Sequence, residues 1–255
     1  MSRDTRAVVH EDAAFAKYAE RGAYHWSEVG RGLLAHNAFT AERYRRVIAS
    51  ASLRDGQRVL DYGCGDGALL GVLPRWSGRA CELHGFDPNP LAVDLAGAAL
   101  AAHGVRATLH GSVDALPLGY FDTAICTEVI EHASAPLDLL RTLGRVLRPG
   151  GRLVVTTPIR LTEFPDDPNH VQEWFPGEFI QLFGAGWRVL SHDSVVPVAA
   201  PEAYFWRPPV FARVPVFRFV CNVLSIYAGV NALSWLRLRP RLFMMQIVVA
   251  EKTAP

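Results

Sequence analysis

Residues 59–70 read VLDYGCGDGALL, and this stretch decides the fold. Its apolar start ends at Asp61, and glycines then follow at alternate positions, Gly63, Gly65 and Gly67. The pattern is typical of a buried strand, a tight turn and the start of a helix. Glycine allows positive φ and the close approach of a ligand, and a helix N-terminus offers free N–H groups. The stretch therefore predicts a turn that holds a cofactor.

Asp61 distinguishes two classes of cofactor. Gly63, Gly65 and Ala68 satisfy the relaxed dinucleotide fingerprint G-x-G-x-x-A, which is a weak signal alone. A carboxylate at the end of the strand would attract a cationic amino group and repel a pyrophosphate. The stretch resembles the first motif of class I methyltransferases that use S-adenosylmethionine (SAM), D/E-x-G-x-G-x-G. The resemblance implies SAM as the cofactor, bound by Asp61, Gly63, Gly65 and Gly67; an ordinary Gly-rich turn is the alternative.

Two later segments fit a nucleoside ligand. The apolar run 81–86 ends at Asp87, whose carboxylate can accept hydrogen bonds from both ribose hydroxyls, and Pro88 follows. Residues 111–117 resemble the family segment G-D-A-x-x-L-P, in which the Asp binds the adenine amino group. Here Ser112 stands in that place with Val113 beside it, and a hydroxyl accepts more weakly than a carboxylate. We expect all four residues at the cofactor.

The remaining pattern predicts an α/β fold. The run LRPGGRLVVTTP at 147–158 resembles the family's L-x-P-G-G-x-L-x-x-x-x-P, which extends the resemblance over about residues 57–158. It implies a Rossmann-like, seven-stranded, mostly parallel sheet with an antiparallel last strand and helices on both faces. We expect a helical N-terminal cap at 1–50, a SAM-binding core at 51–196, a substrate- or membrane-facing apolar and basic insert at 197–240, and the last strand and tail at 241–255.

Element boundaries follow from the same periodicity and from proline and glycine signals. The N-terminal region is expected to be helical from 13 to 50, with interruptions near Gly22 and at Gly30–Gly32. Further helices are expected at 68–73, stopped by Pro74, and at 91–103, 134–147 and 176–183. Strands are expected at 81–86, 106–110, 120–126, 152–157, 187–196 and 241–250.

The chemical centre is expected directly after the fourth strand, in Thr127-Glu128-Val129-Ile130-Glu131-His132. A doubly wound sheet binds its substrate at the carboxyl ends of such strands. Methyl transfer requires alignment of the reactants, which supplies ~7–11 kcal/mol, and removal of a proton from the acceptor. His132 is the predicted general base because an imidazole titrates near neutral pH. Glu131 is expected to orient His132 or share its proton, and Thr127 and Glu128 to border the cofactor.

A metal site is a second interpretation of the same residues. The set resembles that of small-RNA 3′-end 2′-O-methyltransferases and ubiquinone-pathway O-methyltransferases. The resemblance implies a divalent ion (Mg²⁺, Mn²⁺ or Zn²⁺) that lowers the pKa of the acceptor oxygen, held by Glu128, Glu131, His132 and His170. His170 begins HVQEW, which is similar to the family's H-x-x-E-W. In the alternative, Glu128 faces the cofactor, His132 acts alone and His170 caps a turn.

Composition narrows the function classes. The chain has 255 residues, of which 50% are hydrophobic and 20% charged, enough for one large domain with an insert. A net charge of +1 argues against a nucleic-acid partner. The four cysteines form no C-x-x-C pair and are expected to be reduced thiols in a cytoplasmic protein. The first 15 residues carry no apolar run typical of a secretory signal.

The insert between the last two strands is unusual. Residues 203–250 contain six arginines and no acid, and residues 219–236 carry no charge. A single membrane span is disfavoured because its polar residues would need partners in lipid and because the flanking strands belong to one sheet. The pattern favours an interfacial helix with a polar stripe (Arg218, Asn222, Ser225) and an apolar stripe (Phe219, Val223, Ile226, Val230). Residues 203–241 are thus predicted to contact an anionic membrane surface; a substrate-binding cap or an oligomer interface is the alternative.

Together these features predict a SAM-dependent O-methyltransferase that acts on a hydroxyl of a small-molecule or lipid-linked acceptor, in the cytoplasm or at the inner face of the membrane. An RNA 2′-O-methyltransferase and a non-catalytic nucleotide-binding module are the alternatives. An NAD-dependent dehydrogenase is disfavoured by Asp61 and by the Pro149-Gly150-Gly151 run.

Overall fold

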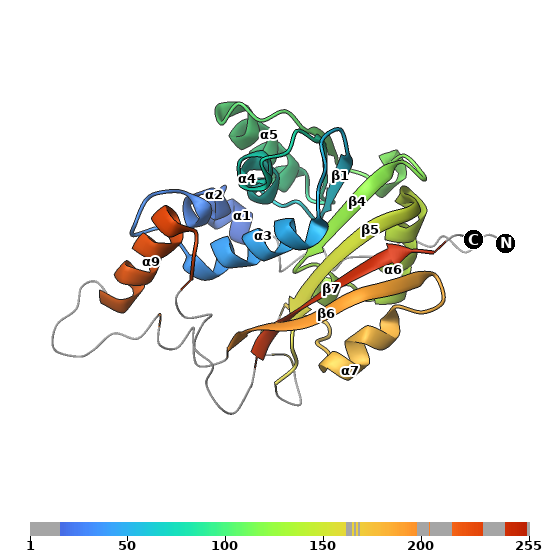
Figure 1. Cartoon of the computed structure of the whole chain (residues 1–255). Helices are drawn as coiled ribbons and strands as arrows, with labels where there is room; N and C mark the ends of the chain where they lie inside the picture. The colour runs from blue at the N-terminus through green and yellow to red at the C-terminus, as the bar shows by residue number, and fades with distance from the viewer. Residues whose placement is uncertain are drawn as a thin grey trace.

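The fold is a seven-stranded sheet in the order β3-β2-β1-β4-β5-β7-β6 (Figure 1). The computed structural model describes residues 16–161, 165, 167, 169–197, 204, 216–231 and 243–253. The strands are β1 (Arg58–Tyr62), β2 (Glu82–Phe86), β3 (Thr108–His110), β4 (Phe121–Thr127), β5 (Leu147–Pro158), β6 (Trp187–Pro197) and β7 (Phe243–Lys252). The five strands from β3 to β5 are parallel, and β7 runs antiparallel to both β5 and β6. The predicted fold class is confirmed.

Two hydrophobic cores lie on opposite faces of the sheet. Successive strand side chains point to opposite faces, so neighbours such as Val59 and Leu60 belong to different cores. One core packs under α3 (Ala38–Ala51), α4 (Ala68–Ser77) and α5 (Pro90–Ala102). The other packs under α6 (Pro136–Val146) and α7 (Pro176–Phe179). Strands buried on both faces explain the continuous apolar runs in the sequence.

Several predicted boundaries were wrong by a few residues. Helix α4 continues through Pro74 to Ser77 and ends at Gly78, which has φ +64°. Proline removes one helical hydrogen bond, and the burial of Leu73 with the packing of Trp76 on the core offsets that loss. Strand β5 begins at Leu147 instead of residue 152. Helix α7 ends at Phe179, and a 3₁₀ turn, Ile180–Leu182, follows it.

The N-terminal cap consists of α1 (Ala16–Arg21), α2 (Tyr24–Val29) and α3. The interruptions lie where Gly22 and Gly30–Gly32 predicted them. Asn37 caps α3, since its side-chain oxygen accepts hydrogen bonds from the backbone N–H groups of Phe39 and Thr40 at 3.1 and 3.4 Å. In Figure 1 these helices lie beside α4.

Most of the insert lies outside the described residues. The described part contains α9 (Val216–Ala228), which packs beside α3 (Figure 1). The predicted N-terminal arm at 1–15 and five of the six arginines, at 207, 213, 237, 239 and 241, fall outside the described ranges. Within those ranges, every helix is too short or too polar to cross a bilayer.

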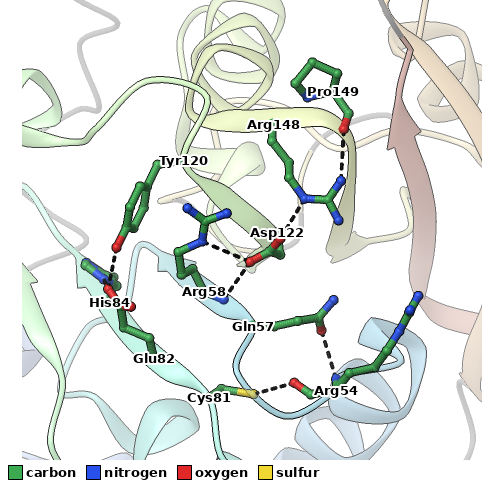
Figure 2. Close-up of polar contacts among 10 residues, drawn as sticks. All are labelled: Arg54, Gln57, Arg58, Cys81, Glu82, His84, Tyr120, Asp122, Arg148 and Pro149. Carbon is green, nitrogen blue, oxygen red and sulfur yellow. Dashed lines mark hydrogen bonds and ion pairs between the residues drawn. The ribbon is translucent and has the colours of Figure 1, made fainter.

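A polar network joins the amino ends of the parallel strands, on the edge of the sheet away from the Gly-rich turn (Figure 2). The Asp122 carboxylate accepts hydrogen bonds from the backbone N–H of Arg58 at 2.9 Å, from Arg58 Nε at 3.1 Å and from Arg148 Nε at 2.6 Å. These bonds tie β1, β4 and β5 together. Asp122 is the one charge in its strand, and its role here is structural.

Candidate active site

The Gly-rich turn connects β1 to α4, and all three of its glycines have positive φ: +79° at Gly63, +53° at Gly65 and +76° at Gly67. At two of these glycines a larger side chain would also clash with neighbouring residues. A Cβ on Gly63 would lie 2.3 Å from Val129 Cγ2, and one on Gly65 would lie 2.1 Å from the Tyr18 hydroxyl oxygen. Glycine is therefore required where other residues closely approach the turn. Contact of the turn with a cofactor stays a prediction.

Asp61 lies buried at the end of β1, with 2% of its surface exposed. Burial, together with the charges of Asp87 and Asp66, raises its pKa to about 8. Among the described residues no cation or hydrogen bond offsets this effect. A buried carboxylate without a partner is costly, and the amino group of SAM would supply the missing positive charge. The site thus fits the cofactor at this residue.

Asp87 follows β2 and faces the same turn. Its carboxylate accepts hydrogen bonds from the backbone N–H groups of Gly65 and Asn89, both at 2.9 Å. Burial raises the pKa of Asp87, although those two bonds act in the opposite direction. Asp87 and Pro88 line a small cavity of 70 Å³ that also reaches Gly63 and His132. The ribose contact of Asp87 and Pro88 stays a prediction.

A cavity of 410 Å³ joins the Gly-rich turn to the chemical centre. Gly63, Gly65 and Thr127 line it, together with Glu128, Glu131, His132 and His170. Helices α1 and α2 close its outer side with Lys17, Tyr18, Tyr24 and His25. The polar lining and its contact with both motifs make this cavity the candidate active site.

The cap is fastened to the Gly-rich turn through Asp66. His25 donates its backbone N–H to Asp66 Oδ2 at 2.9 Å, and Trp26 Nε1 donates to the Asp66 carbonyl at 2.6 Å. Trp26 packs on Gly71 of α4 and stacks on His103. The aromatic segment before the first strand therefore covers the turn, with Tyr24 and His25 at the cavity and Trp26 on the helix.

Glu128 has φ +53°, which is unusual for a residue other than glycine. Two neighbours hold its side chain: Thr156 Oγ1 donates to Oε1 at 2.9 Å, and Arg43 Nη1 lies 3.3 Å from Oε2. Strained backbone of this kind is concentrated at functional sites because the surroundings must enforce it. Arg43, from α3, was not predicted from sequence.

Glu131 is fully buried, and only one of its two carboxylate oxygens has a hydrogen-bond partner. Its Oε2 accepts a hydrogen bond from Thr157 Oγ1 at 3.1 Å, whereas the buried Oε1 has no partner. Burial, and next the charge of Glu128, raises the pKa of Glu131 well above its usual range. The predicted orientation of His132 by Glu131 is not observed.

His132 is oriented instead by the backbone of Asn169, since its Nδ1 lies 2.9 Å from that carbonyl oxygen. A carbonyl only accepts hydrogen bonds, so Nδ1 carries the proton and Nε2 keeps a free lone pair. Burial lowers the pKa of His132, which favours this neutral form. The His132 ring lies edge-on to His170, with centroids 5.0 Å apart.

His170 has a carboxylate partner, because its Nδ1 lies 2.6 Å from Glu173 Oε1. Glu173 is buried, with 4% of its surface exposed, and it fixes the ring as second-layer carboxylates do around metal sites. Ligand atoms of Glu131, His132 and His170 lie within 4.8 Å of one another. Glu128, the fourth predicted ligand, is absent from this group; it bonds to Arg43 and Thr156 instead.

Four predicted residues lie apart from the lining of the two cavities: Asp61 and Gly67, which lie at the two ends of the turn, and Ser112 and Val113. The Ser112 hydroxyl caps its own 3₁₀ turn by accepting from the Asp114 N–H at 3.3 Å. Sequence reasoning missed Lys17, Tyr18, Arg43 and Asn169. Only Glu173, in the H-x-x-E spacing, left a recognisable signal.

Comparison with known proteins identifies the family to which the chain belongs. A family model described as a methyltransferase domain matches residues 34–192. The chain belongs to the class I SAM-dependent methyltransferases. The matched region contains the Gly-rich turn and the residues from Glu128 to His170. The cavity residues from α1 and α2 precede it. The family predicted from sequence is confirmed.

Relatives differ in what their names describe. A mitochondrial ubiquinone biosynthesis O-methyltransferase of Schizosaccharomyces pombe is 32% identical over 139 residues, which are 52% of this chain and 50% of that protein. A tRNA U34 carboxymethyltransferase of Cellvibrio japonicus is 37% identical over 131 residues, 45% of this chain and 37% of that protein. The matches thus span half or less of these curated relatives.

Solved structures support the fold. A SAM-dependent methyltransferase from Aquifex aeolicus superposes with a TM-score of 0.54 at 19% identity, covering 82% of this chain and 89% of that one. At that identity the likeness is evidence for the fold alone.

Proposed function

We propose that this methyltransferase moves a methyl group from SAM to a hydroxyl of a small-molecule or lipid-linked acceptor. The observation that carries the proposal is the 410 Å³ cavity, because Gly63 and Gly65 line one part of it and His132 another. A cofactor on the turn and an acceptor beside the imidazole would share one space. The ubiquinone O-methyltransferase relative supports a hydroxyl as the acceptor group.

In the proposed complex, Asp61 lies closest to the SAM amino group and Asp87 with Pro88 to the ribose. Backbone groups of Gly63, Gly65 and Gly67 border the cofactor, and Thr127 with Glu128 close the space beside it. Ser112 and Val113 remain the proposed contacts near adenine. Bound SAM supplies a methyl group attached to a positively charged sulfur.

His132 is the proposed general base. SAM bound by Asp61 and Asp87 would supply the methyl group to the acceptor oxygen, and its sulfur would keep the electron pair of the former carbon–sulfur bond. The hydroxyl proton passes to Nε2 of His132, the nitrogen left free by the bond from Nδ1 to Asn169. General base catalysis of this kind contributes about 10²–10⁴-fold. The products are a methyl ether and S-adenosylhomocysteine, and the imidazolium returns its proton to water.

A transfer assay tests the proposal. Purified protein is incubated with methyl-labelled SAM and a panel of phenols, catechols and prenylated phenols, and label in extracted products is counted. We expect label in a hydroxyl-bearing compound, with His132→Ala much slower. If label is transferred to amines or to RNA, and to none of the hydroxyl compounds, the acceptor assignment is wrong.

A divalent metal beside the acceptor is a second proposal. It is favoured by the buried, unpartnered Oε1 of Glu131 and by the Nδ1 bonds that leave Nε2 as the ligand atom of His132 and of His170, the latter 3.9 Å from Asp167 Oδ2. These three ligands, with Glu173 behind His170, would hold the ion and lower the pKa of the acceptor hydroxyl. The ion itself is the probe: calorimetry with Mn²⁺ and Zn²⁺ should detect binding that Glu131→Gln and His170→Ala abolish.

Glu128→Gln is the matched control for the metal, because Glu128 is outside the three-ligand group. It should retain binding. No heat of binding in the wild-type protein, or equal binding by His170→Ala, would contradict a metal site and leave His132 as a base acting alone.

A lipid-linked acceptor would place the enzyme in the cytoplasm at the inner face of a membrane. Residues 203–241 are the proposed contact with that surface, on the basis of their arginines and lack of acids.

A further inference from the structure

Helix α9 is docked on the protein through its polar stripe. Asn222 and Ser225 are buried, with 1% and 0% of their surface exposed. Asn222 Nδ2 donates to the carbonyls of Leu33 and His36 at 2.8 and 2.9 Å. Ser225 Oγ lies 2.9 Å from His36 Nε2, and Arg45 Nη2 donates to the Ser225 carbonyl at 2.7 Å. Hydrogen bonds therefore fix which face of α9 meets the protein.

The opposite face of α9 is apolar and exposed. Phe217, Phe219, Val220 and Tyr227 have 43%, 42%, 47% and 67% of their surface exposed. Leu34, whose carbonyl accepts a hydrogen bond from Arg218 at 3.3 Å, is 72% exposed. We call these five side chains the α9 patch. Of the predicted apolar stripe only Phe219 is exposed, whereas Val223, Ile226 and Val230 are half-buried. A helix that buries polar side chains and exposes apolar ones is the reverse of the usual surface helix, and such a patch marks an interaction site.

Charge indicates what the patch contacts. Residues 203–250 hold six arginines and no acid. Within the described part, the Arg31 guanidinium lies 5.4 Å from the centre of the Tyr227 ring, at the edge of the patch. Apolar and aromatic side chains with an arginine beside them match an anionic bilayer surface, where rings enter the headgroup layer and guanidinium groups pair with phosphate. A helix too short to span can lie flat there.

We propose that the α9 patch inserts into the surface of an anionic lipid bilayer and holds the enzyme there. The inference rests on the proposed membrane location and needs no particular methyl acceptor. Helix α3 links the two regions, because Arg45 bonds to α9 while Arg43, two residues earlier, lines the active-site cavity. Residues two positions apart on a helix do not share a face, so α9 and the cavity contact α3 on different sides. Docking through α9 would hold the enzyme at the surface where a lipid-linked acceptor would be found.

Vesicle flotation tests the patch with the full-length protein. Phosphatidylcholine vesicles with and without phosphatidylglycerol are the probes, at low and high NaCl. We expect binding that requires phosphatidylglycerol and weakens with salt. Phe219→Ser with Tyr227→Ser should weaken binding at least about tenfold, since each side chain loses its apolar contact with lipid. Arg31→Gln should reduce the part of binding that salt suppresses.

Matched controls lie elsewhere on the surface. Leu118→Ser with Leu190→Ser removes two apolar side chains that are 64% and 40% exposed, and Arg106→Gln removes an exposed arginine from the segment between α5 and β3. These controls should float as the wild type does. SAM binding, measured separately, should be equal in all variants, which separates this inference from the proposed reaction.

Two outcomes would overturn the inference. One is wild-type protein that ignores anionic vesicles at low salt. The other is equal flotation of the patch variant and the wild type. Light scattering tests the alternative that a second copy of the chain covers the patch. In that case the wild type would be a dimer that does not bind vesicles, and Phe219→Ser with Tyr227→Ser would convert it to a monomer.

Discussion

At the scale of single residues, Asp61 gives the most direct test of the cofactor site. Its pKa of about 8 means that much of it is protonated at pH 7 before ligand binds. A cationic amino group favours the ionised form, so SAM binding should release a proton and should strengthen as pH rises from about 6 to 8. Calorimetry in two buffers of different ionisation enthalpy measures the release. Asp61→Asn should abolish it and weaken binding by about 1.5–3 kcal/mol.

Stability supplies the control for Asp61. Because the folded pKa is raised, the folded protein binds the extra proton, and stability falls as pH rises between about 4 and 8. Asp61→Asn cannot lose this stability. The difference in melting temperature between the variant and the wild type should therefore shift in favour of the variant as pH rises across that range, and should stay constant above it. A variant that binds SAM normally, or whose melting temperature shows no such trend, would contradict the assignment.

His132 should affect turnover far more than cofactor binding. Its Nε2 is the atom that faces the acceptor in the proposed reaction, so His132→Ala should lower kcat by about 10²–10⁴-fold. The dissociation constant for SAM should change little. His192→Ala, which removes a histidine bonded to Gln246 on β7 instead, is the control. Loss of SAM binding with normal turnover of bound cofactor would refute the assigned role.

At the scale of elements, the Asp122 network should stabilise the sheet without touching the site (Figure 2). Hydrogen bonds from Arg58 and Arg148 lower the pKa of Asp122 to about 2, against the effect of burial. A lowered pKa adds stability above about pH 4 that is lost as pH falls toward 2. Asp122→Asn should therefore cost about 1–2.5 kcal/mol at pH 7 and progressively less below pH 4, measured by urea unfolding.

A matched change is available on α6. Asp138 pairs with Arg141 one turn later, and the two side chains are 35% and 70% exposed. Asp138→Asn should cost less than about 0.5 kcal/mol because exposed pairs contribute little. SAM affinity should be unchanged in both variants. An equal cost for the two substitutions would mean that the strand-end network adds no more than an ordinary surface pair.

Elements were predictable where local pattern and packing agree. The Gly-rich turn and the strands around it follow from apolar runs and glycines alone, because both faces of those strands are buried. The end of α4 was missed because Pro74 is a local stop signal, which the packing of Leu73 and Trp76 overrides. The first strand residues of β5 were missed because Pro149 and Gly150 resemble a loop.

The site was predictable only in part, for a related reason. Motif residues lie close in sequence, so Glu131 and His132 could be named, but their partners come from elsewhere in the chain. Asn169 orients His132, and Arg43 holds Glu128. For α9 the sequence pattern predicted a polar and an apolar stripe, but not which of the two faces the protein. Hydrogen bonds to the distant Leu33, His36 and Arg45 determine that the polar stripe points inward.

At the scale of the whole molecule, the insert should be separable from the SAM-binding core. Strands β6 and β7 pair up to Pro197 and Phe243, so the two ends of the insert lie opposite each other. A tight turn can therefore replace residues 198–242. We expect the shortened protein to bind SAM with unchanged affinity, since the Gly-rich turn, Asp61 and Asp87 lie outside the insert.

Acceptor methylation and vesicle binding should both be lost in the shortened protein. The loss of α9 removes the lipid contact, and it also frees Arg45 of α3, the helix that brings Arg43 to the cavity. The two effects can be told apart by the patch variant Phe219→Ser with Tyr227→Ser, which keeps the Ser225 contact with Arg45. If that variant methylates a water-soluble acceptor normally but a vesicle-borne one poorly, the insert acts by bringing the enzyme to lipid. Full activity of the shortened protein on both acceptors would exclude any role of the insert in the reaction.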